Sequence, residues 1–304
     1  TPTTTTKHFR RAITMDTEEN AKVFTLKFLT QQMKVRLKAV KNDYWLRIDR
    51  IGKRIAGIED LSFLEWLYLK IRITGMSNPD TKYVKIDEVQ DYTTAQLAIL
   101  LDIFAVANFL LLGDENQAIK LARIFDEIRH VFEATRGEVS ECHLMTSYRS
   151  TPAITELFAK LAITADGMQI SSDSEQNEPE FHECATESEY IQNLVQAARE
   201  SKELKGTTAF VALNTEAATR TAQLLGDDSP ALIGEGDTLP NSGSILLALP
   251  LAKGLEFDHV VIVNASKEDF PDNDLSRRRL YTAISRATST VSVFSNGELS
   301  PLLK

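Results

Sequence analysis

The spacing of apolar residues differs between the first 80 residues and the rest of the chain. Over residues 16–41 and about 59–74, apolar side chains recur at helical spacing, which predicts one helix in each segment. The second segment runs up to Gly75, and glycine is favoured just beyond a helix end. Because apolar positions nearly encircle this second helix, we expect it to be buried.

Beyond residue 80, short apolar runs alternate with amphipathic stretches, a pattern typical of parallel strands joined by crossover helices. The predicted strands are 82–86, 108–112, about 141–145, 180–184, 207–213, 244–249, 259–264 and 290–294. The predicted helices are near 93–104, 151–163, 187–200, 215–225 and 276–287. The acidic, serine-rich stretch 171–179 predicts a surface loop. The pattern therefore predicts an α/β fold, and two α/β layers fit it better than one.

Acidic residues follow two of the predicted strands directly. Asp87 and Glu88 come after the strand 82–86, and Asp114 follows the strand 108–112. In open α/β sheets, ligands bind beyond the carboxyl ends of the strands. Mg²⁺ accepts one or two carboxylates together with phosphate oxygens, and Glu88 could then polarise an attacking water. For one strand-end acid taken alone, Asp87 or Asp114, a solvated turn residue is an equally good interpretation.

Composition narrows the class of protein. The 304 residues are 43% apolar, enough for two domains of ordinary size, and no apolar run reaches the ~20 residues that cross a bilayer. The first residues lack the apolar core of a signal peptide, so we expect a cytoplasmic protein with no membrane partner. Cys142 and Cys184 form no metal-like or redox-like pair and are expected to be buried thiols. The net charge of −9 argues against a surface dominated by phosphate contacts, so any nucleic-acid groove must be local.

Five short motifs then occur in order along the chain, and we expect each of them at a strand-to-helix junction. They are "DEVQD" at 87–91, "GDENQ" at 113–117, "SYRS" at 147–150, "KGLEF" at 253–257 and "RRRLYTAISRA" at 277–287. Together they resemble the superfamily 1 nucleic-acid motors of the Rep and UvrD class, over roughly residues 81–290. The resemblance implies two RecA-like P-loop NTPase lobes, the first of them incomplete, with ATP and Mg²⁺ as cofactors. It gives a helical segment at 1–80, the end of the first lobe at 81–143 and the second lobe at 144–304.

The resemblance also implies a role for each residue of a nucleotide site. Two catalytic residues belong to the first lobe: Glu88 as general base and Gln117 as the sensor of the γ-phosphate, beside Asp87 as the Mg²⁺ ligand. From the second lobe, Arg149 and Arg286 look like the arginines that neutralise charge in the transition state. The remaining implied contacts to nucleotide are Tyr148 stacking on adenine, Glu256 at the ribose or phosphate edge, and Gly254 permitting close backbone approach.

Simpler interpretations stand beside these roles. Tyr148 could belong to the core, and Asp91 is expected to cap the helix that follows it. Lys253 is expected to position the backbone or to lie at the surface rather than to act in catalysis. Arg278 and Arg279 are expected to decorate a helix.

Several features of the family are missing from this sequence. No segment supplies the phosphate-cradling pattern G-x-x-x-x-G-K-[ST], since "IGKR" at 51–54 lacks the upstream Gly and the Ser or Thr. We therefore expect the missing N-terminal part of the same protein to carry that loop, and the chain alone to hydrolyse ATP poorly. About 100 residues separate "SYRS" from "KGLEF", too few for the large domain that Rep-like helicases insert there.

Three positions that grip the DNA strand in those helicases also differ. Ala248 and Pro250 stand where a Thr and a His are usual, and Lys120 replaces an aromatic residue that stacks on a base, a contact of ~1–3 kcal/mol. A sequence that keeps the residues of the ATPase site but lacks those that bind the DNA strand resembles the HelD family. Members of that family bind RNA polymerase and free it from nucleic acid. The helices of residues 1–80 are then either the end of a first-lobe insertion or ordinary lobe helices. Two alternatives remain open: a true DNA helicase that moves on single-stranded DNA, and a non-catalytic interaction module.

Overall fold

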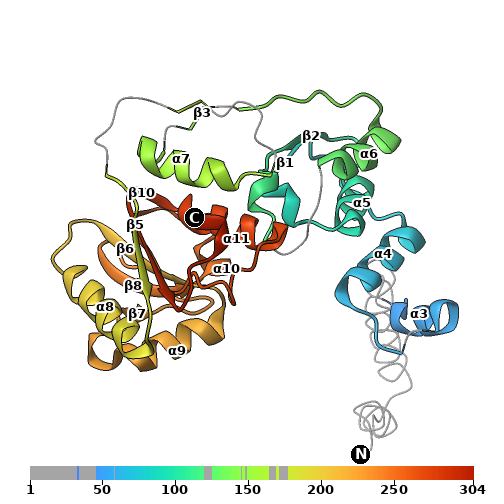
Figure 1. Ribbon diagram of the computed structural model, residues 1–304. Coiled ribbons are helices and arrows are strands. Elements are labelled where there is room, and N and C mark those ends of the chain that lie inside the picture. Colours follow the sequence, from blue (N-terminus) through green and yellow to red (C-terminus); the bar gives the residue numbers. More distant parts are fainter. Residues whose placement is uncertain are drawn as a thin grey trace, which may run out of the picture. The chain divides into compact units, whose positions relative to one another are not determined.

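The computed structural model describes residues 33, 46–57, 59–119, 125–144, 146–147, 149–163, 169–170 and 177–304 (Figure 1). The predicted helix 16–41, apart from Met33, lies outside the described residues, as do Lys120, Tyr148 and most of the loop 171–179. The chain divides into two compact units, Thr1–Asn78 and Pro79–Lys304, which are described separately.

The first unit contains helices α3 (Ile48–Ala56) and α4 (Phe63–Thr74), of which α3 was not predicted. A capping box between Ser62 and Glu65 starts α4, and Gly75, at φ 65°, ends it as expected. The predicted burial of α4 is wrong. Ile71 is its one buried residue among those described, whereas Phe63 is 76% exposed, because α3 is a short helix that can cover only part of an apolar circumference.

The second unit begins with a two-stranded parallel sheet of β1 (Tyr83–Ile86) and β2 (Asn108–Leu111), in which Ile86 is opposite Leu111. Helix α5 (Thr94–Ile103) connects the strands, and α6 (Phe125–Arg136), which was not predicted, follows β2. Side chains of β1, of the 3-10 helix η1 (Val89–Asp91), and of α5 and α6 form a small core: Ile86, Val89, Leu97, Leu101, Ile128 and Phe132. We call this part the first lobe.

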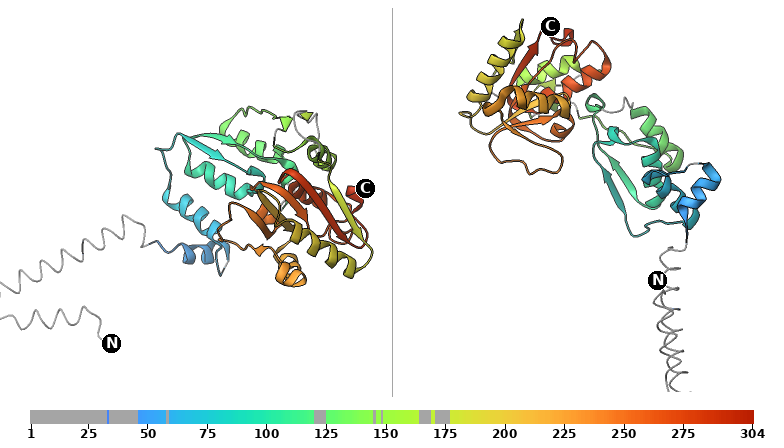
Figure 2. Two further views of the ribbon diagram at one scale, coloured as in Figure 1. Left: turned by 90° about the vertical axis from the view of Figure 1, so that its left-hand side faces the viewer. Right: turned by 90° about the horizontal axis from the view of Figure 1, so that it is seen from below.

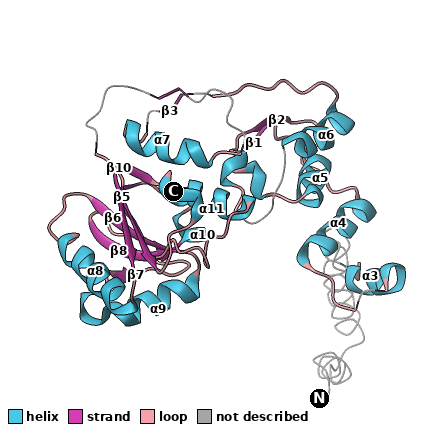
Figure 3. Cartoon of the chain, in the orientation of Figure 1, coloured by secondary structure: helices cyan, strands magenta, loops and turns pink. Residues whose placement is uncertain are grey.

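The rest of the second unit, the second lobe, is built on a six-stranded parallel sheet of order β5-β10-β9-β6-β8-β7 (Figure 1). Its strands are β5 (Glu180–Cys184), β6 (Thr207–Ala212), β7 (Ala231–Leu232), β8 (Gly243–Ala248), β9 (Phe257–Ile262) and β10 (Ala287–Asn296). Its helices are α7 (Pro152–Leu161), α8 (Glu187–Glu200), α9 (Thr215–Leu225), α10 (Leu249–Ala252) and α11 (Asp274–Ile284). Figures 2 and 3 show these helices around the sheet.

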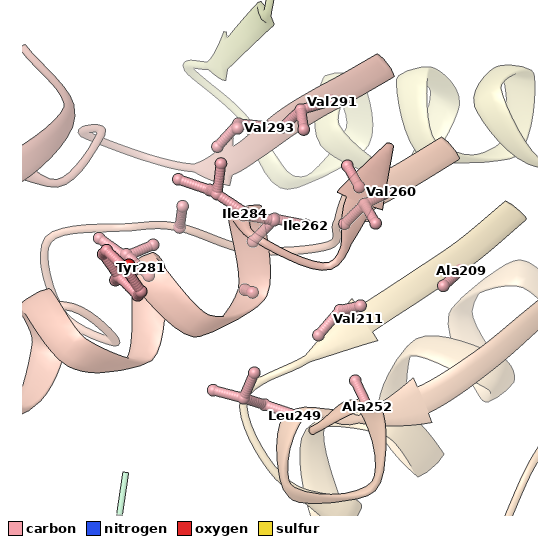
Figure 4. Close-up of a cluster of buried hydrophobic side chains, with 14 of the residues drawn as sticks. Ala209, Val211, Leu249, Ala252, Val260, Ile262, Tyr281, Ile284, Val291 and Val293 are labelled. Carbon is pink, nitrogen blue, oxygen red and sulfur yellow. The ribbon is translucent and has the colours of Figure 1, made fainter. Parts of the chain in front are cut away.

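Successive residues of the central strands enter opposite cores, because side chains alternate across a sheet. Ala209 and Val211 of β6 pack with α7, α10 and α11, and Figure 4 shows part of this core, including Tyr281 and Ile284 of α11. Phe210 packs on the other face with α8 and α9. Both faces of the sheet are therefore covered by helices, and the strands are parallel, as the alternation of apolar runs and amphipathic stretches predicted.

The predicted α/β class with mainly parallel sheets is confirmed. One predicted strand is wrong: residues 141–144 form no strand, and the short β3 (Thr146–Ser147) pairs instead with β4 (Gln169–Ile170). Cys184 is buried as expected, but Cys142 is exposed because it lies in this extended segment. None of the described helices has the length and apolarity needed to cross a bilayer.

Candidate functional site

The carboxyl end of β1 carries the first two acids of the site. Asp87 Oδ1 accepts a hydrogen bond from the Glu88 backbone N–H at 3.0 Å, and Lys85 Nζ lies 3.9 Å from Asp87 Oδ2. Glu88 has φ 51° and ψ 44° and is the one residue other than glycine with a positive φ in the described part of the chain. Such left-handed backbone costs about 1–3 kcal/mol in a non-glycine residue and is concentrated at functional sites.

Gln90 connects the ends of the two strands of the first lobe. Its side chain is fully buried, donates to Glu88 Oε2 at 2.6 Å and accepts from the Asp114 backbone N–H at 3.2 Å. A Cβ at Gly113 would overlap Gln90 Oε1 and crowd Val89 Cγ1, so glycine favours this close approach. The sequence analysis missed Gln90. Its one signal was an uncharged polar residue among the acids of "DEVQD".

Asp114 and Gln117 extend this network toward the second lobe. Asp114 Oδ1 accepts from the Asn116 backbone N–H at 2.9 Å and so caps the short 3-10 helix η2 (Glu115–Gln117). Gln117 donates from Nε2 to Asp114 Oδ2 at 2.8 Å, while its Oε1 accepts from Arg286 Nη2 at 2.7 Å. One side-chain amide therefore joins an acid of the first lobe to an arginine of the second.

Arg286 lies just after α11 and is 2% exposed. Besides Gln117, its guanidinium donates to Thr282 O at 3.2 Å, to Leu255 O at 3.3 Å and to Ser285 Oγ at 3.1 Å. These bonds come from the fork of donors that only arginine offers. The side chain is therefore fixed before any ligand binds.

Several charges converge on Arg286. Burial, followed by the charge of Arg149, lowers the pKa of the Arg286 guanidinium, whereas Glu88, Asp114 and Glu256 oppose that change. Acids of the first lobe and arginines of the second therefore act on one another electrostatically.

Arg149 and Glu256 pair with each other in the second lobe. Arg149 Nε lies 2.8 Å from Glu256 Oε1, and both side chains are about half exposed. The neighbouring Gly254 has φ 81° and open space around the position of a Cβ, so its backbone conformation, not crowding, favours glycine. Tyr148, the residue expected to stack on adenine, lies outside the described residues.

The structure corrects the expectations that Lys253 could lie at the surface and that Asp91 caps a helix. The Lys253 side chain is 8% exposed, and its Nζ donates to both oxygens of Asp91 at 2.8 Å, so it is not a surface residue. Asp91 does not cap α5, because Thr93 takes that role in a capping box with Gln96. Asp91 instead pairs with a cation of the second lobe.

Two residues of α11 also differ from expectation or were missed. Arg278 does not decorate the helix surface, since it is 8% exposed and its Nε has no hydrogen-bond partner among the described atoms. Arg279 is partly exposed. Tyr281, which no motif argument singled out, packs edge-on against Phe158 at 5.2 Å, and burial and the Asp114 carboxylate raise the pKa of its phenol.

The two lobes contribute opposite ends of their strands. Asp87 and Asp114 follow strands, whereas Glu256 precedes β9 and Arg286 precedes β10. The expectation that every motif lies at a strand-to-helix junction is therefore wrong for "KGLEF" and "RRRLYTAISRA". The site combines the carboxyl edge of the first sheet with the amino edge of the second.

The residues present fit a magnesium ion held together with phosphate. No group of three or more His, Cys, Asp or Glu side chains in the described part of the chain could hold a metal alone. Mg²⁺ bound with nucleotide needs only one or two carboxylates, and the Asp87 side chain is 70% exposed. Asp87 would hold the ion, which would supply positive charge to the phosphate oxygens.

Comparison with known proteins bears on the second lobe. The family model of the UvrD-like helicase C-terminal domain matches residues 250–294, which include Lys253, Glu256 and Arg286. This stretch is much shorter than half of the chain. A search of curated proteins finds no match.

The solved structures that resemble the chain include the following two. One is the C-terminal domain of a possible DNA helicase from Lactobacillus plantarum WCFS1, with 27% identity and a TM-score of 0.44, over 52% of this chain and 92% of that one. The other is S. cerevisiae Dbp5 bound to RNA and ADP BeF3, with 12% identity and a TM-score of 0.46, over 74% of this chain and 56% of that one. The chain thus spans little more than half of the Dbp5 chain. Over residues 250–294 the chain is similar to the UvrD-like helicase C-terminal domain.

Proposed function

We propose that the chain forms most of the nucleotide site of an ATP-driven nucleic-acid motor. The observation that carries the proposal is the hydrogen-bonded series Asp114–Gln117–Arg286, which joins the strand-end acids of one lobe to a buried arginine of the other. A triphosphate bound between such groups would be held by both lobes, so binding and hydrolysis would change how the lobes are held together.

Each group has a chemical task in this proposal. Glu88 would accept a proton from the attacking water, and Asp87 would hold Mg²⁺. Arg149 and Arg286 would neutralise the charge that develops on the transferred phosphoryl group. Arg149 is paired with Glu256, so it would have to exchange that partner to bind phosphate.

The finer part of the proposal concerns the partner. We place the motor in the HelD-like class of cytoplasmic ATPases that release and recycle RNA polymerase, acting on polymerase-bound nucleic acid. Supporting this, Ala248 is buried and apolar, and Pro250 has no side-chain group that could hydrogen bond to a DNA strand. The net charge of −9 is also unfavourable for a long phosphate-binding surface.

The test uses the natural gene product that contains these residues, because residues 1–304 include no phosphate-cradling loop. We expect steady-state phosphate release from Mg-ATP, and Glu88→Gln should abolish turnover while ATP still binds, because only the base is lost. Co-migration with core RNA polymerase, without unwinding of a tailed duplex, would support the HelD-like role.

Two other outcomes would replace this proposal. Salt-dependent binding to single-stranded DNA with unwinding of the tailed duplex would identify a DNA helicase. Polymerase binding without any ATP turnover would identify a non-catalytic interaction module. Normal turnover in Glu88→Gln would show that Glu88 is not the base.

A further inference from the structure

Lys253 is a buried cation of the second lobe that two acids of the first lobe surround. Its Nζ donates to Asp91 Oδ1 and Oδ2, each at 2.8 Å, and lies 3.4 Å from Glu88 Oε2. Lys253 and Asp91 are 162 positions apart in the sequence. Since Lys253 lies between α10 and β9, this contact ties the amino edge of the second sheet to the segment that follows β1.

The Glu88 carboxylate is held from two sides. Gln90, of its own lobe, donates to Oε2 at 2.6 Å, and Lys253, of the other lobe, approaches the same oxygen. The backbone of Glu88, at φ 51°, is in a conformation that persists only where its surroundings impose it. The orientation of this carboxylate therefore depends on contacts beyond β1.

We propose that Lys253 is a positioning residue that makes the orientation of the Glu88 carboxylate depend on the position of the second lobe. This inference rests on the proposed function, because it concerns the residue assigned there as general base. Asp91 anchors the ammonium group through its two shorter contacts, and the anchored ammonium group then fixes Glu88 through the longer one. Moving the second lobe away would separate the ammonium group from both acids and would release Glu88.

Hydrogen exchange on the 304-residue chain tests the positioning directly and needs no ATP turnover. We expect Lys253→Met to raise amide exchange by about tenfold or more over residues 86–92 and 253–256, which corresponds to losing part of one ion-pair network. Asp91→Asn should raise exchange by a similar factor. The double variant should exchange no faster than the more severe single variant, because both single variants and the double variant remove the same interaction.

The matched control is Lys267→Met. The Lys267 ammonium group lies 3.3 Å from Glu298 in the same lobe, and both side chains are 55% exposed. This variant should leave exchange over residues 86–92 unchanged. The inference is overturned if Lys253→Met also leaves that segment unchanged, or if the effects of Lys253→Met and Asp91→Asn simply add.

Turnover in the gene product gives the second readout. We expect Lys253→Met to lower kcat by about 10- to 100-fold with a smaller change in KM, because a misplaced base affects the chemical step more than substrate binding. Lys253→Arg, which keeps the charge, should recover part of kcat. If KM rises and kcat does not fall, Lys253 contributes to binding and the inference is wrong. If the gene product without substitutions shows no turnover, the proposed function fails. The exchange experiment still decides whether Lys253 positions residues 86–92.

Discussion

Arg286 donates a hydrogen bond from Nη2 to the side-chain oxygen of Gln117, 2.7 Å away and 169 positions earlier in the sequence. The same amide donates to Asp114 at 2.8 Å, so its orientation is fixed by an acid on one side and by a guanidinium group on the other. A carboxylate at position 117 could not serve both partners, because it cannot donate a hydrogen bond to Asp114. This explains in physical terms why an amide lies at the junction of the two lobes.

The first prediction concerns Gln117→Ala. We expect it to lower the free energy of unfolding of the 304-residue chain by about 1–2 kcal/mol, because a donor of the buried Arg286 then loses its acceptor. Urea unfolding followed by circular dichroism measures this change. The control is Gln196→Ala, in which an exposed amide that donates to Glu200 at 2.6 Å is removed. Equal effects of the two variants would show that the link between the lobes contributes nothing to stability.

The elements of this fold were largely predictable because their signals are local. The central strands β6, β8 and β9 contain runs of apolar residues, and Gly75 marks the end of α4. The burial of α4 was not predictable in this way. An apolar circumference tells what a helix could bury, whereas exposure depends on which elements lie against it.

In the candidate site, too, features with a local sequence signal were predictable and features that depend on packing were not. Asp87 and Glu88 were recognisable because they directly follow the apolar residues that predict β1, although only Ile86 of this strand is buried. The ion pair of Lys253 and Asp91 was not predicted, because each residue has an ordinary local interpretation and the two lie 162 positions apart in the sequence. Gln90 was missed for a related reason, since its burial follows from the packing of two strand ends.

The second prediction compares Arg286→Ala with Arg286→Lys in the gene product. Both should lower ATP turnover by about 10³-fold, because lysine cannot reproduce the fork of donors that is held by Thr282, Leu255 and Gln117. Nucleotide affinity should fall less, since the charge matters most in the transition state. Phosphate release and binding of a fluorescent ATP analogue separate the two effects. Full turnover in Arg286→Lys would show that charge alone suffices.

The third prediction concerns alkaline pH. Burial raises the pKa of the Tyr281 and Tyr190 phenols in the folded state, so folding favours their neutral forms. The stability that this contributes is complete below the unfolded value of about 10 and is lost as the pH rises above it. The melting temperature should therefore fall above about pH 10. Tyr281→Phe should reduce the slope of that fall and keep the ring against Phe158. An unchanged slope in Tyr281→Phe would show that the Tyr281 phenol does not cause the loss of stability.

The last prediction concerns acid pH and Asp258, which holds the start of β6. The Thr207 backbone N–H donates to Asp258 Oδ2 at 2.7 Å, and the Thr207 hydroxyl lies 3.1 Å from the same oxygen. These hydrogen bonds, the backbone one foremost, lower the pKa of the folded Asp258 carboxyl against the opposing effect of burial. Its contribution to stability is therefore present above the unfolded pKa of about 3.9 and is lost as the pH falls through the lower folded value. Asp258→Asn should lower the melting temperature at pH 7, and the difference from the parent should shrink steadily below about pH 4. A difference that stays constant down to pH values of about 2 would mean that shape, and not the charge of Asp258, stabilises this corner of the sheet.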